Sequence, residues 1–285
     1  IAQIGCGRIG LTMDMIGFFK AKGSRVIAAA DLDKRRLEYF RSIIARRYKM
    51  KNPQSVIGAT DYHDLLSNKD IDAFSISTPD HWHAQIAIEA AFADKHVYMQ
   101  KPASLTIKEG RYFSNAISET GKTFLLGSQQ RSWGHFHDAC AFVREGRIGK
   151  VLRIEVGLPG DPAGGSLKEM AVPKNLNYDF WLGSTPEVYY TEDRVHSQNR
   201  NIRSAINSRP GWLRCEQFGA GMITGWGSHH LDIVHWAMGW EKIGPKYIEG
   251  KGKFHTKGLW DVHGDYDITL TYPDGTPVRV WNKYP

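Results

Sequence analysis

The chain has 285 residues, of which 41% are hydrophobic and 24% are charged. These proportions are ordinary for a globular protein, and the length allows two domains that each bury a core. The formal net charge of +7 comes without a long basic run, so no nucleic-acid partner is expected. No apolar run reaches the length of a membrane span, which predicts no membrane insertion, and three scattered cysteines exclude a disulfide framework.

A glycine-rich turn follows directly on the first apolar run, residues 1–4. It reads Gly5-Cys6-Gly7-Arg8-Ile9-Gly10 and leads into a helical pattern that stops near residue 23. Gly5 permits a tight turn, Gly7 lets a pyrophosphate approach the backbone, and Gly10 allows close packing of helix on strand. A helix N-terminus offers unpaired N–H groups and a positive dipole to phosphates. This loop, with Arg8 and Ile9 in its variable positions, is therefore predicted to bind a dinucleotide.

An acidic residue ends the second apolar run, residues 26–30. Asp31 stands about 20 residues beyond the last glycine, where such folds place the carboxylate that accepts ribose hydroxyl protons. This position favours NAD as the cofactor. Arg35 and Arg36 follow at once and leave NADP possible, because arginine side chains can hold a 2′-phosphate.

Strand and helix patterns alternate through residues 1–128. The predicted strands lie at 1–4, 26–30, 56–58, 71–77, 96–99 and 123–126. The alternation predicts an N-terminal α/β domain, residues 1–128, with the doubly wound parallel sheet of the Rossmann fold. The loops at Gly5, Asp31, Thr78 and Gln100 then share the carboxyl edge of the sheet, where such folds bind ligands.

Residues 129–285 have a different pattern. We expect helices near 135–144 and 222–238, a strand near 151–157, an irregular stretch to about 218, and strands near 246–254, 266–272 and 278–281. This predicts an α+β substrate and oligomerisation domain with a largely antiparallel, open sheet. The chain starts without Met and ends just after a strand, so both ends read as truncated. The sequence therefore leaves two compartments possible, the cytoplasm or, after export, a periplasm.

Four motifs occur in a recognisable order. After the glycine loop come Ser77-Thr78-Pro79-Asp80-His81-Trp82-His83, then Gln100-Lys101-Pro102, then Gly219-Ala220-Gly221 leading to Gly227-Ser228-His229-His230-Leu231-Asp232. Together they resemble the Gfo/Idh/MocA oxidoreductases, the family of glucose–fructose oxidoreductase and inositol dehydrogenase. The resemblance implies an NAD(P)-dependent enzyme that moves a hydride between nicotinamide and a hydroxyl carbon of a sugar or cyclic polyol. It also implies a homo-oligomer, dimer or tetramer, formed through the C-terminal sheet.

The resemblance assigns catalytic roles to Lys101 and His229. A buried lysine near oxidised nicotinamide has a lowered pKa and can accept the proton of the reacting hydroxyl. The family pattern places further cofactor contacts at the ends of two later strands, at Thr78, Pro79, His83, Gln100 and Lys101. Arg131, Trp226 and Asp232 are expected to bind the substrate.

Two positions depart from the family pattern. Gln100 stands where the family usually has glutamate, and Gly225 stands where it has an aspartate one turn before the catalytic histidine. The family combines this aspartate with the catalytic lysine and histidine, and here that set of three is incomplete. An alternative therefore stays open, a redox-neutral NAD-dependent glycosidase or lyase that oxidises its sugar transiently. A non-catalytic cofactor-binding sensor is a third possibility. No metal is expected, because the local histidine pairs lack a convincing third ligand.

Overall fold

A computed structural model describes residues 1–282 of the chain. Its internal contacts divide the chain into two compact units. The first unit contains Ile1–Gly127 and Ser166–Trp212, and the second contains Ser128–Gly165 and the chain from Leu213 onward. Residues 166–212 thus pack with the N-terminal sheet, whereas the sequence analysis grouped them with the C-terminal domain. The domain boundary near residue 128 stays a prediction.

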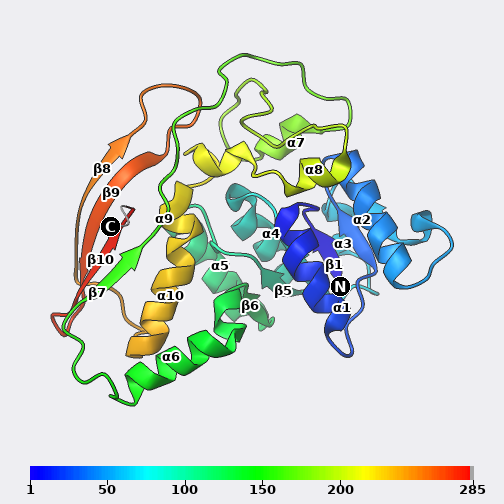
Figure 1. The fold of residues 1–285 in the computed structure, drawn as a ribbon. Coiled ribbons are helices and arrows are strands. Elements are labelled where there is room, and N and C mark those ends of the chain that lie inside the picture. Colours follow the sequence, from blue (N-terminus) through cyan, green and yellow to red (C-terminus); the bar gives the residue numbers. More distant parts are fainter. Residues whose placement is uncertain (283–285) are drawn as a thin grey trace. The chain divides into compact units, whose positions relative to one another are not determined.

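The first unit is built on a six-stranded parallel sheet with the strand order β3-β2-β1-β4-β5-β6 (Figure 1). The strands are β1 (Ala2–Ile4), β2 (Ala28–Ala30), β3 (Ile57–Ala59), β4 (Ala73–Ile76), β5 (His96–Met99) and β6 (Phe124–Leu126). This order confirms the predicted doubly wound sheet. The order reverses between β1 and β4, and such reversals open a crevice for ligands at the carboxyl ends of the strands.

Helices connect the strands of this sheet. They are α1 (Met15–Lys20), α2 (Lys34–Arg47), α3 (His63–Leu66), α4 (Asp80–Phe92) and α5 (Ile107–Thr120), and the later segment adds α7 (Tyr178–Leu182) and α8 (Ile202–Asn207). One buried apolar cluster joins β4 to α4 around Phe74 and Ile86. A second joins α2 to the glycine loop and to α8 through Phe40, Cys6 and Ile206. Ile206 belongs to this second core, so α8 is anchored beside the glycine loop and α2.

The second unit contains a four-stranded sheet with the strand order β7-β10-β9-β8. Its strands are β7 (Ile154–Gly157), β8 (Tyr247–Phe254), β9 (His263–Thr271) and β10 (Pro277–Trp281). Only β7 and β10 pair in parallel, so the prediction of a largely antiparallel sheet is confirmed. The helix α10 (Gly227–Met238) packs on one face through Val234, against Leu270 and Val278. The helix α6 (Gly134–Arg144) contacts α10 in turn.

The other face of this second sheet is polar. Arg279 and Asp267 form a bidentate ion pair across β10 and β9, and every residue of β8 is exposed. Use of this face in an oligomer stays a prediction. Within residues 1–282, no helix has the length and apolar character needed to cross a membrane.

The predicted helix over 222–238 is two helices. The first, α9 (Gly221–Gly225), ends before Trp226, and α10 begins at Gly227. Trp226 lies at φ −98° and ψ −30°, away from ideal helix geometry, and glycines on both sides weaken the helix at this point. Gly225 and His229 therefore do not lie on one uninterrupted helix, which corrects the expectation of a single helix over 222–238.

The turn after β1 requires glycine. Gly5 has φ +85°, and a Cβ placed on it would lie 2.6 Å from the carbonyl oxygen of Ser77. Its N–H donates to the carbonyl of Ala30 at 2.9 Å. Gly5 therefore lets the end of β1 pack directly against the end of β4.

This packing makes a prediction about stability. Gly5→Ala should lower the free energy of unfolding by at least about 2 kcal/mol, because the new methyl group meets backbone in a strained conformation. Gly17→Ala is the matched control, since Gly17 is an exposed position in α1 with nothing within 4 Å of a Cβ. It should stabilise the protein by about 0.5–1 kcal/mol. Urea denaturation of the cofactor-free protein measures both, and equal effects would contradict the assignment of close packing at Gly5.

Candidate functional site

The loop after β1 leaves backbone accessible at its middle glycine. A Cβ on Gly7 would meet only Nη1 of Arg36, at 3.9 Å, whereas a Cβ on Gly10 would lie 2.9 Å from the carbonyl oxygen of Gly5. Arg8 and Ile9 are exposed. A single π-helical turn, Gly10–Asp14, then leads into α1. Open backbone at the start of a helix fits the diphosphate of a dinucleotide.

Asp31 lies directly after β2 with both carboxylate oxygens engaged. One oxygen accepts the N–H of Cys6 at 2.7 Å and the other accepts the N–H of Asp33 at 2.8 Å. Burial raises the pKa of Asp31 to about 6, although the nearby Arg36 opposes this shift. A carboxylate oxygen has two lone pairs, so each can accept one further hydroxyl proton. The carboxyl group is thus fixed where a ribose would be recognised.

The two arginines that follow are held by the protein itself. Arg36 is buried beside Asp31 and Asp33, and its Nη2 donates to the carbonyl of Ala205 at 3.3 Å. Arg35 donates through both Nη atoms to residues of the later segment, namely Gln198, Asn199 and Arg200. Holding a 2′-phosphate would compete with these contacts.

A buried carboxylate, Asp14, connects the three loops at this edge of the sheet. It accepts hydrogen bonds from the hydroxyl of Ser77, at the end of β4, and from Nε2 of Gln100, at the end of β5. Burial raises the pKa of Asp14 to about 6, and both hydrogen bonds oppose the shift. The Gln100 amide therefore contacts Asp14 and the Tyr98 hydroxyl, an arrangement that the sequence analysis did not anticipate.

Thr78 contributes an unsatisfied hydroxyl between these loops. Its Oγ1 is buried and has no hydrogen-bond partner within residues 1–282. Pro79 follows as the N-cap residue of α4. Buried hydroxyls are normally paired, so Thr78 Oγ1 is suited to a ligand at the point where the strand order reverses.

His83, predicted to line the nicotinamide end of the cofactor, joins two backbone segments. Its Nδ1 lies 2.6 Å from the carbonyl oxygen of Pro102, and its Nε2 lies 3.0 Å from that of Thr78. Burial lowers the pKa of His83 to about 4, against the influence of both carbonyls. The imidazole holds the loop of Lys101 and Pro102 against the first turn of α4.

Lys101 is partly buried at the end of β5, next to two charged groups. Burial lowers its pKa, the carboxylate of Asp80 raises it, and the guanidinium of Arg209 lowers it further. Asp80 is the first residue of α4 and only 5% exposed. Sequence reasoning quoted Asp80 in a motif but gave it no role. Its position three residues before His83 was not a sufficient signal.

Asp33 anchors the segment 166–212 on the first unit. Its buried carboxylate accepts hydrogen bonds from Asn175 Nδ2 at 2.9 Å, Gln198 Nε2 at 3.0 Å and His196 Nε2 at 3.1 Å, and it also caps α2. Burial by itself would raise the pKa of Asp33, but these hydrogen bonds together hold the pKa well below its usual range. Burial lowers the pKa of His196 to about 4. The adenosine end of the predicted site thus adjoins a segment distant in sequence.

The predicted substrate residues lie in the second unit, and two of them contact each other. Arg131 donates to both carboxylate oxygens of Asp232, at 2.7 and 2.8 Å, and its guanidinium lies 5.3 Å from the centre of the Trp236 ring. A bidentate pair of this kind fixes both side chains. Arg131 and Asp232 can therefore offer a rigid polar surface, with fewer free donors than the sequence analysis assumed.

His229 and Trp226 form an adjacent group. His229 is buried, with its Nε2 3.4 Å from the amide nitrogen of Gln129 and its ring edge-on to Trp226 at 5.7 Å. Trp226 is 38% exposed and stacks on His230. A Cβ on Gly225 would meet the Met222 side chain at 3.2 Å. Gly225 itself supplies no carboxylate at the position of the family aspartate.

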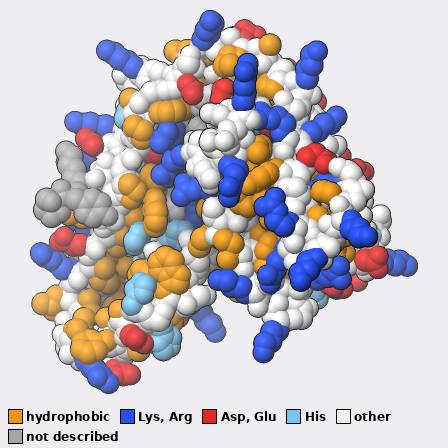
Figure 2. Space-filling model, turned by 45° about the vertical axis from the view of Figure 1, so that its right-hand side comes forward, with side chains coloured by type: hydrophobic (Ala, Val, Ile, Leu, Met, Phe, Trp, Pro, Cys, Tyr) orange, Lys and Arg blue, Asp and Glu red, His pale blue; other side chains and the backbone are white. Residues whose placement is uncertain are grey.

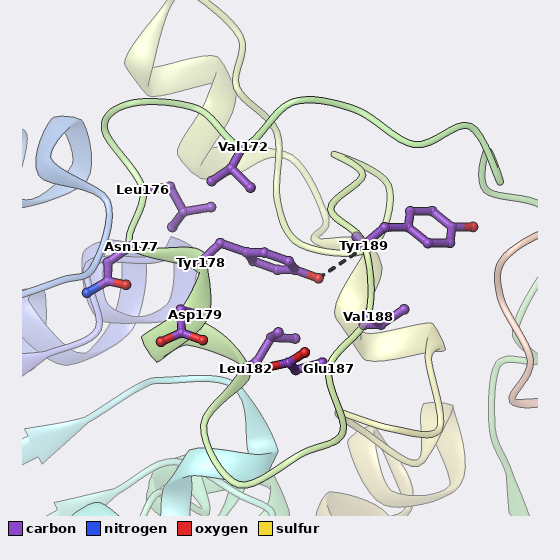
Figure 3. A pocket seen from close by; sticks show the side chains of 9 residues that line it. All are labelled: Val172, Leu176, Asn177, Tyr178, Asp179, Leu182, Glu187, Val188 and Tyr189. Atoms are coloured by element: carbon purple, nitrogen blue, oxygen red, sulfur yellow. Dashed lines mark hydrogen bonds between the residues drawn. The ribbon is translucent and has the colours of Figure 1, made fainter.

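A separate cavity in the structure is lined by none of the predicted site residues. A cavity of about 650 Å³ lies in the segment 166–212, with the apolar Leu176, Leu182 and Val188 beside Asp179 and Glu187 (Figure 3). Lys and Arg side chains are spread over the face shown in Figure 2. Within residues 1–282, no three His, Cys, Asp or Glu side chains are grouped to hold a metal ion.

Two family models match separate parts of the chain. The model of the Gfo/Idh/MocA oxidoreductase family with an NAD-binding Rossmann fold matches residues 1–128, and that of the family's C-terminal alpha/beta domain matches residues 163–282. The chain belongs to the Gfo/Idh/MocA oxidoreductase family. Its first unit therefore contains an NAD-binding Rossmann fold, as the glycine loop and Asp31 predicted.

Curated relatives extend this match. The oxidoreductase YrbE of Bacillus subtilis is 31% identical over 65% of this chain and 54% of its own length. Levoglucosan dehydrogenase of Pseudarthrobacter phenanthrenivorans is 32% identical over 38% of this chain and 26% of its own length. A glycosyl hydrolase family 109 protein of Shewanella putrefaciens is 32% identical over 39% and 25%. The chain thus matches about half or less of these relatives.

A solved structure has the same fold. The WlbA dehydrogenase of Bordetella pertussis, in complex with NADH and UDP-GlcNAcA, aligns with a TM-score of 0.70 at 16% identity. The alignment covers 100% of this chain and 72% of that one. The likeness establishes a shared fold.

The contacts of Asp33 lead to a second prediction. Asp33→Ala leaves the donors of Asn175, His196 and Gln198 without their buried acceptor and should lower the free energy of unfolding by about 3 kcal/mol. Hydrogen exchange should accelerate in residues 196–207 and stay unchanged in β4 and β5. The control Asp64→Asn, at an exposed position of α3, should change neither quantity. Uniform exchange rates in Asp33→Ala would refute the anchoring role.

Proposed function

We propose that this chain is part of an NAD-dependent oxidoreductase acting on a hydroxyl carbon of a sugar or cyclic polyol. The observation that carries the proposal is the partly buried Lys101 with a lowered pKa, at the edge of the sheet that also bears the glycine loop. Residues 1–128 match an NAD-binding fold, so a titratable amine at this edge adjoins a redox cofactor site.

The cofactor residues have distinct tasks in this proposal. The backbone at Gly7, Arg8 and Ile9 holds the diphosphate, and Asp31 accepts protons from the adenosine ribose. Thr78 offers its unsatisfied hydroxyl to the bound group, and Pro79 and His83 shape the same turn. Gln100 supports the site through Asp14. When bound, NAD⁺ takes up the two electrons removed from the carbinol carbon.

Lys101 is the proposed general base. Oxidation of a hydroxyl carbon requires removal of the hydroxyl proton, and an amine with a lowered pKa is neutral in a larger fraction of molecules near neutral pH. In the reverse direction the ammonium of Lys101 returns the proton. Partial burial limits the contact of Lys101 with bulk water.

The second unit supplies the proposed substrate contacts. His229 assists as a hydrogen-bond partner of a substrate hydroxyl, the exposed face of Trp226 suits the C–H face of a sugar ring, and the fixed pair of Arg131 and Asp232 offers further polar contacts. The similarity to levoglucosan dehydrogenase supports a carbohydrate substrate, and the sugar itself stays open.

A redox-neutral glycosidase is the second candidate. Its support is the similarity to a glycosyl hydrolase family 109 protein and the absence of a carboxylate at Gly225. Such an enzyme would return the electrons to its own product, so no NADH would accumulate.

The third prediction tests both candidates with the full-length protein, NAD, and a panel of sugars, inositols, anhydrosugars and aryl glycosides. NADH absorbance and aglycone release are followed in the same wells. We expect NADH to form on a free sugar or polyol, and Lys101→Ala to lower kcat/KM by at least about a hundredfold. The control Lys69→Ala, at an exposed position, should retain activity.

Each other outcome selects a different function. Aglycone release that needs NAD and yields no NADH would replace the dehydrogenase with the glycosidase. If neither NADH nor aglycone is formed although the cofactor binds tightly, a cofactor-binding sensor would be favoured. Full activity of Lys101→Ala would remove Lys101 from the mechanism.

The fourth prediction concerns the choice of cofactor. NAD should bind at least about tenfold more tightly than NADP, because the Asp31 carboxylate repels a 2′-phosphate and Arg35 and Arg36 are engaged by protein carbonyls. Asp31→Asn should weaken NAD binding and reduce this ratio, as measured by calorimetry. Tighter binding of NADP to the wild type would show that Arg36 leaves its present contacts for the phosphate.

A further inference from the structure

Asp80 is a largely buried residue whose carboxylate receives no hydrogen bond from the described residues. Its side chain is only 5% exposed, and within residues 1–282 it has no hydrogen bond and no ion pair within 4.0 Å. Buried carboxylates are normally hydrogen-bonded or paired. An isolated one at the carboxyl edge of the sheet therefore calls for a functional explanation.

The neighbours of Asp80 on α4 are all held by other groups. His81 and Trp82 both contact the carbonyl of Trp181, at 2.9 and 3.0 Å. His83 contacts Pro102 and Thr78, as described above. The first turn of α4 is thus rigid, and its contact with Pro102 brings it against the loop that carries Lys101.

The titratable groups around Lys101 come from two elements. Asp80 approaches from the start of α4, Arg209 from the segment after α8, and His83 from the same turn as Asp80. Since burial keeps His83 neutral near pH 7, Asp80 and Arg209 are the two charged groups that face the amine. Their effects on Lys101 have opposite signs.

We propose that Asp80 is the positioning residue for Lys101, a carboxylate that orients the ammonium and sets the pH range in which Lys101 accepts a proton. The inference deepens the proposed function and rests on it for its catalytic meaning. The charge coupling itself is a property of the first unit and exists without substrate.

The coupling has a definite dependence on pH. Burial raises the pKa of Asp80 to about 7, with Lys101 opposing the shift. Below that pH the carboxyl group is neutral and has little effect on Lys101. Above it the carboxylate stabilises the ammonium, so removing the charge should make Lys101 lose its proton more easily.

The test measures the amine directly, in the cofactor-free full-length protein. Lys101 is labelled with trace acetic anhydride between pH 5 and 11, and its peptide is quantified by mass spectrometry. We expect Asp80→Asn to move the labelling curve about one pH unit toward acid. At pH 8 this means up to about tenfold more labelling, and below pH 6 the two curves should coincide.

Three further variants complete the design. Asp80→Ser removes the charge with a smaller side chain and replaces Asp80→Asn if that variant does not fold, as judged by circular dichroism. Asp80→Glu should restore most of the wild-type curve, and Asp64→Asn should leave it unchanged. An unaltered Lys101 curve in a folded Asp80→Asn or Asp80→Ser protein would overturn the proposal.

The same variants separate this inference from the proposed function. With the active substrate, the pH at which kcat rises should shift in the same direction as the labelling curve. A shifted labelling curve together with full activity of Lys101→Ala would support the coupling and reject Lys101 as the base. An unshifted curve with inactive Lys101→Ala would reject only the role of Asp80.

Discussion

The carboxylate of Asp14 holds together the part of the molecule on which its chemistry depends. It lies in the helix that follows the glycine loop and accepts hydrogen bonds from Ser77 and Gln100. These two donors lie directly after β4 and β5. One buried group therefore connects the glycine loop, the turn before α4 and the loop of Lys101. Burying a carboxylate costs free energy unless donors compensate it. Neutral donors stabilise it here.

The first unit could be predicted from sequence because its signals are local. The glycine loop, the apolar runs and the caps each act over a few residues, as in α5, where Thr106 and Glu109 form a capping box and Gly121 ends the helix at φ +65°. Parallel strands joined by helices have few alternative arrangements. The position of Asp31 also followed from spacing alone.

What escaped prediction depends on contacts between distant residues. Asp33 and His196 are 163 positions apart, and no periodicity in residues 166–212 indicates which surface that segment covers. The pairing of Arg131 with Asp232 spans 101 positions, so both were read as free to contact substrate. The contact of Gln100 with Asp14 was not anticipated for a related reason. A glutamine after a strand can point toward a ligand or toward the protein, and the buried Asp14 decides between them.

The absence of a close ion pair between Asp80 and Lys101 suits a base that must change its protonation state. Two opposite charges 4 Å apart attract by about 4 kcal/mol at an effective dielectric constant of 20, which would keep the lysine protonated over a wide pH range. Asp80 forms no ion pair within 4.0 Å among the described residues, and burial together with Arg209 acts in the opposite direction. The carboxylate thus acts on the ammonium through its charge and forms no close ion pair with it. A substrate hydroxyl can then compete for the same proton.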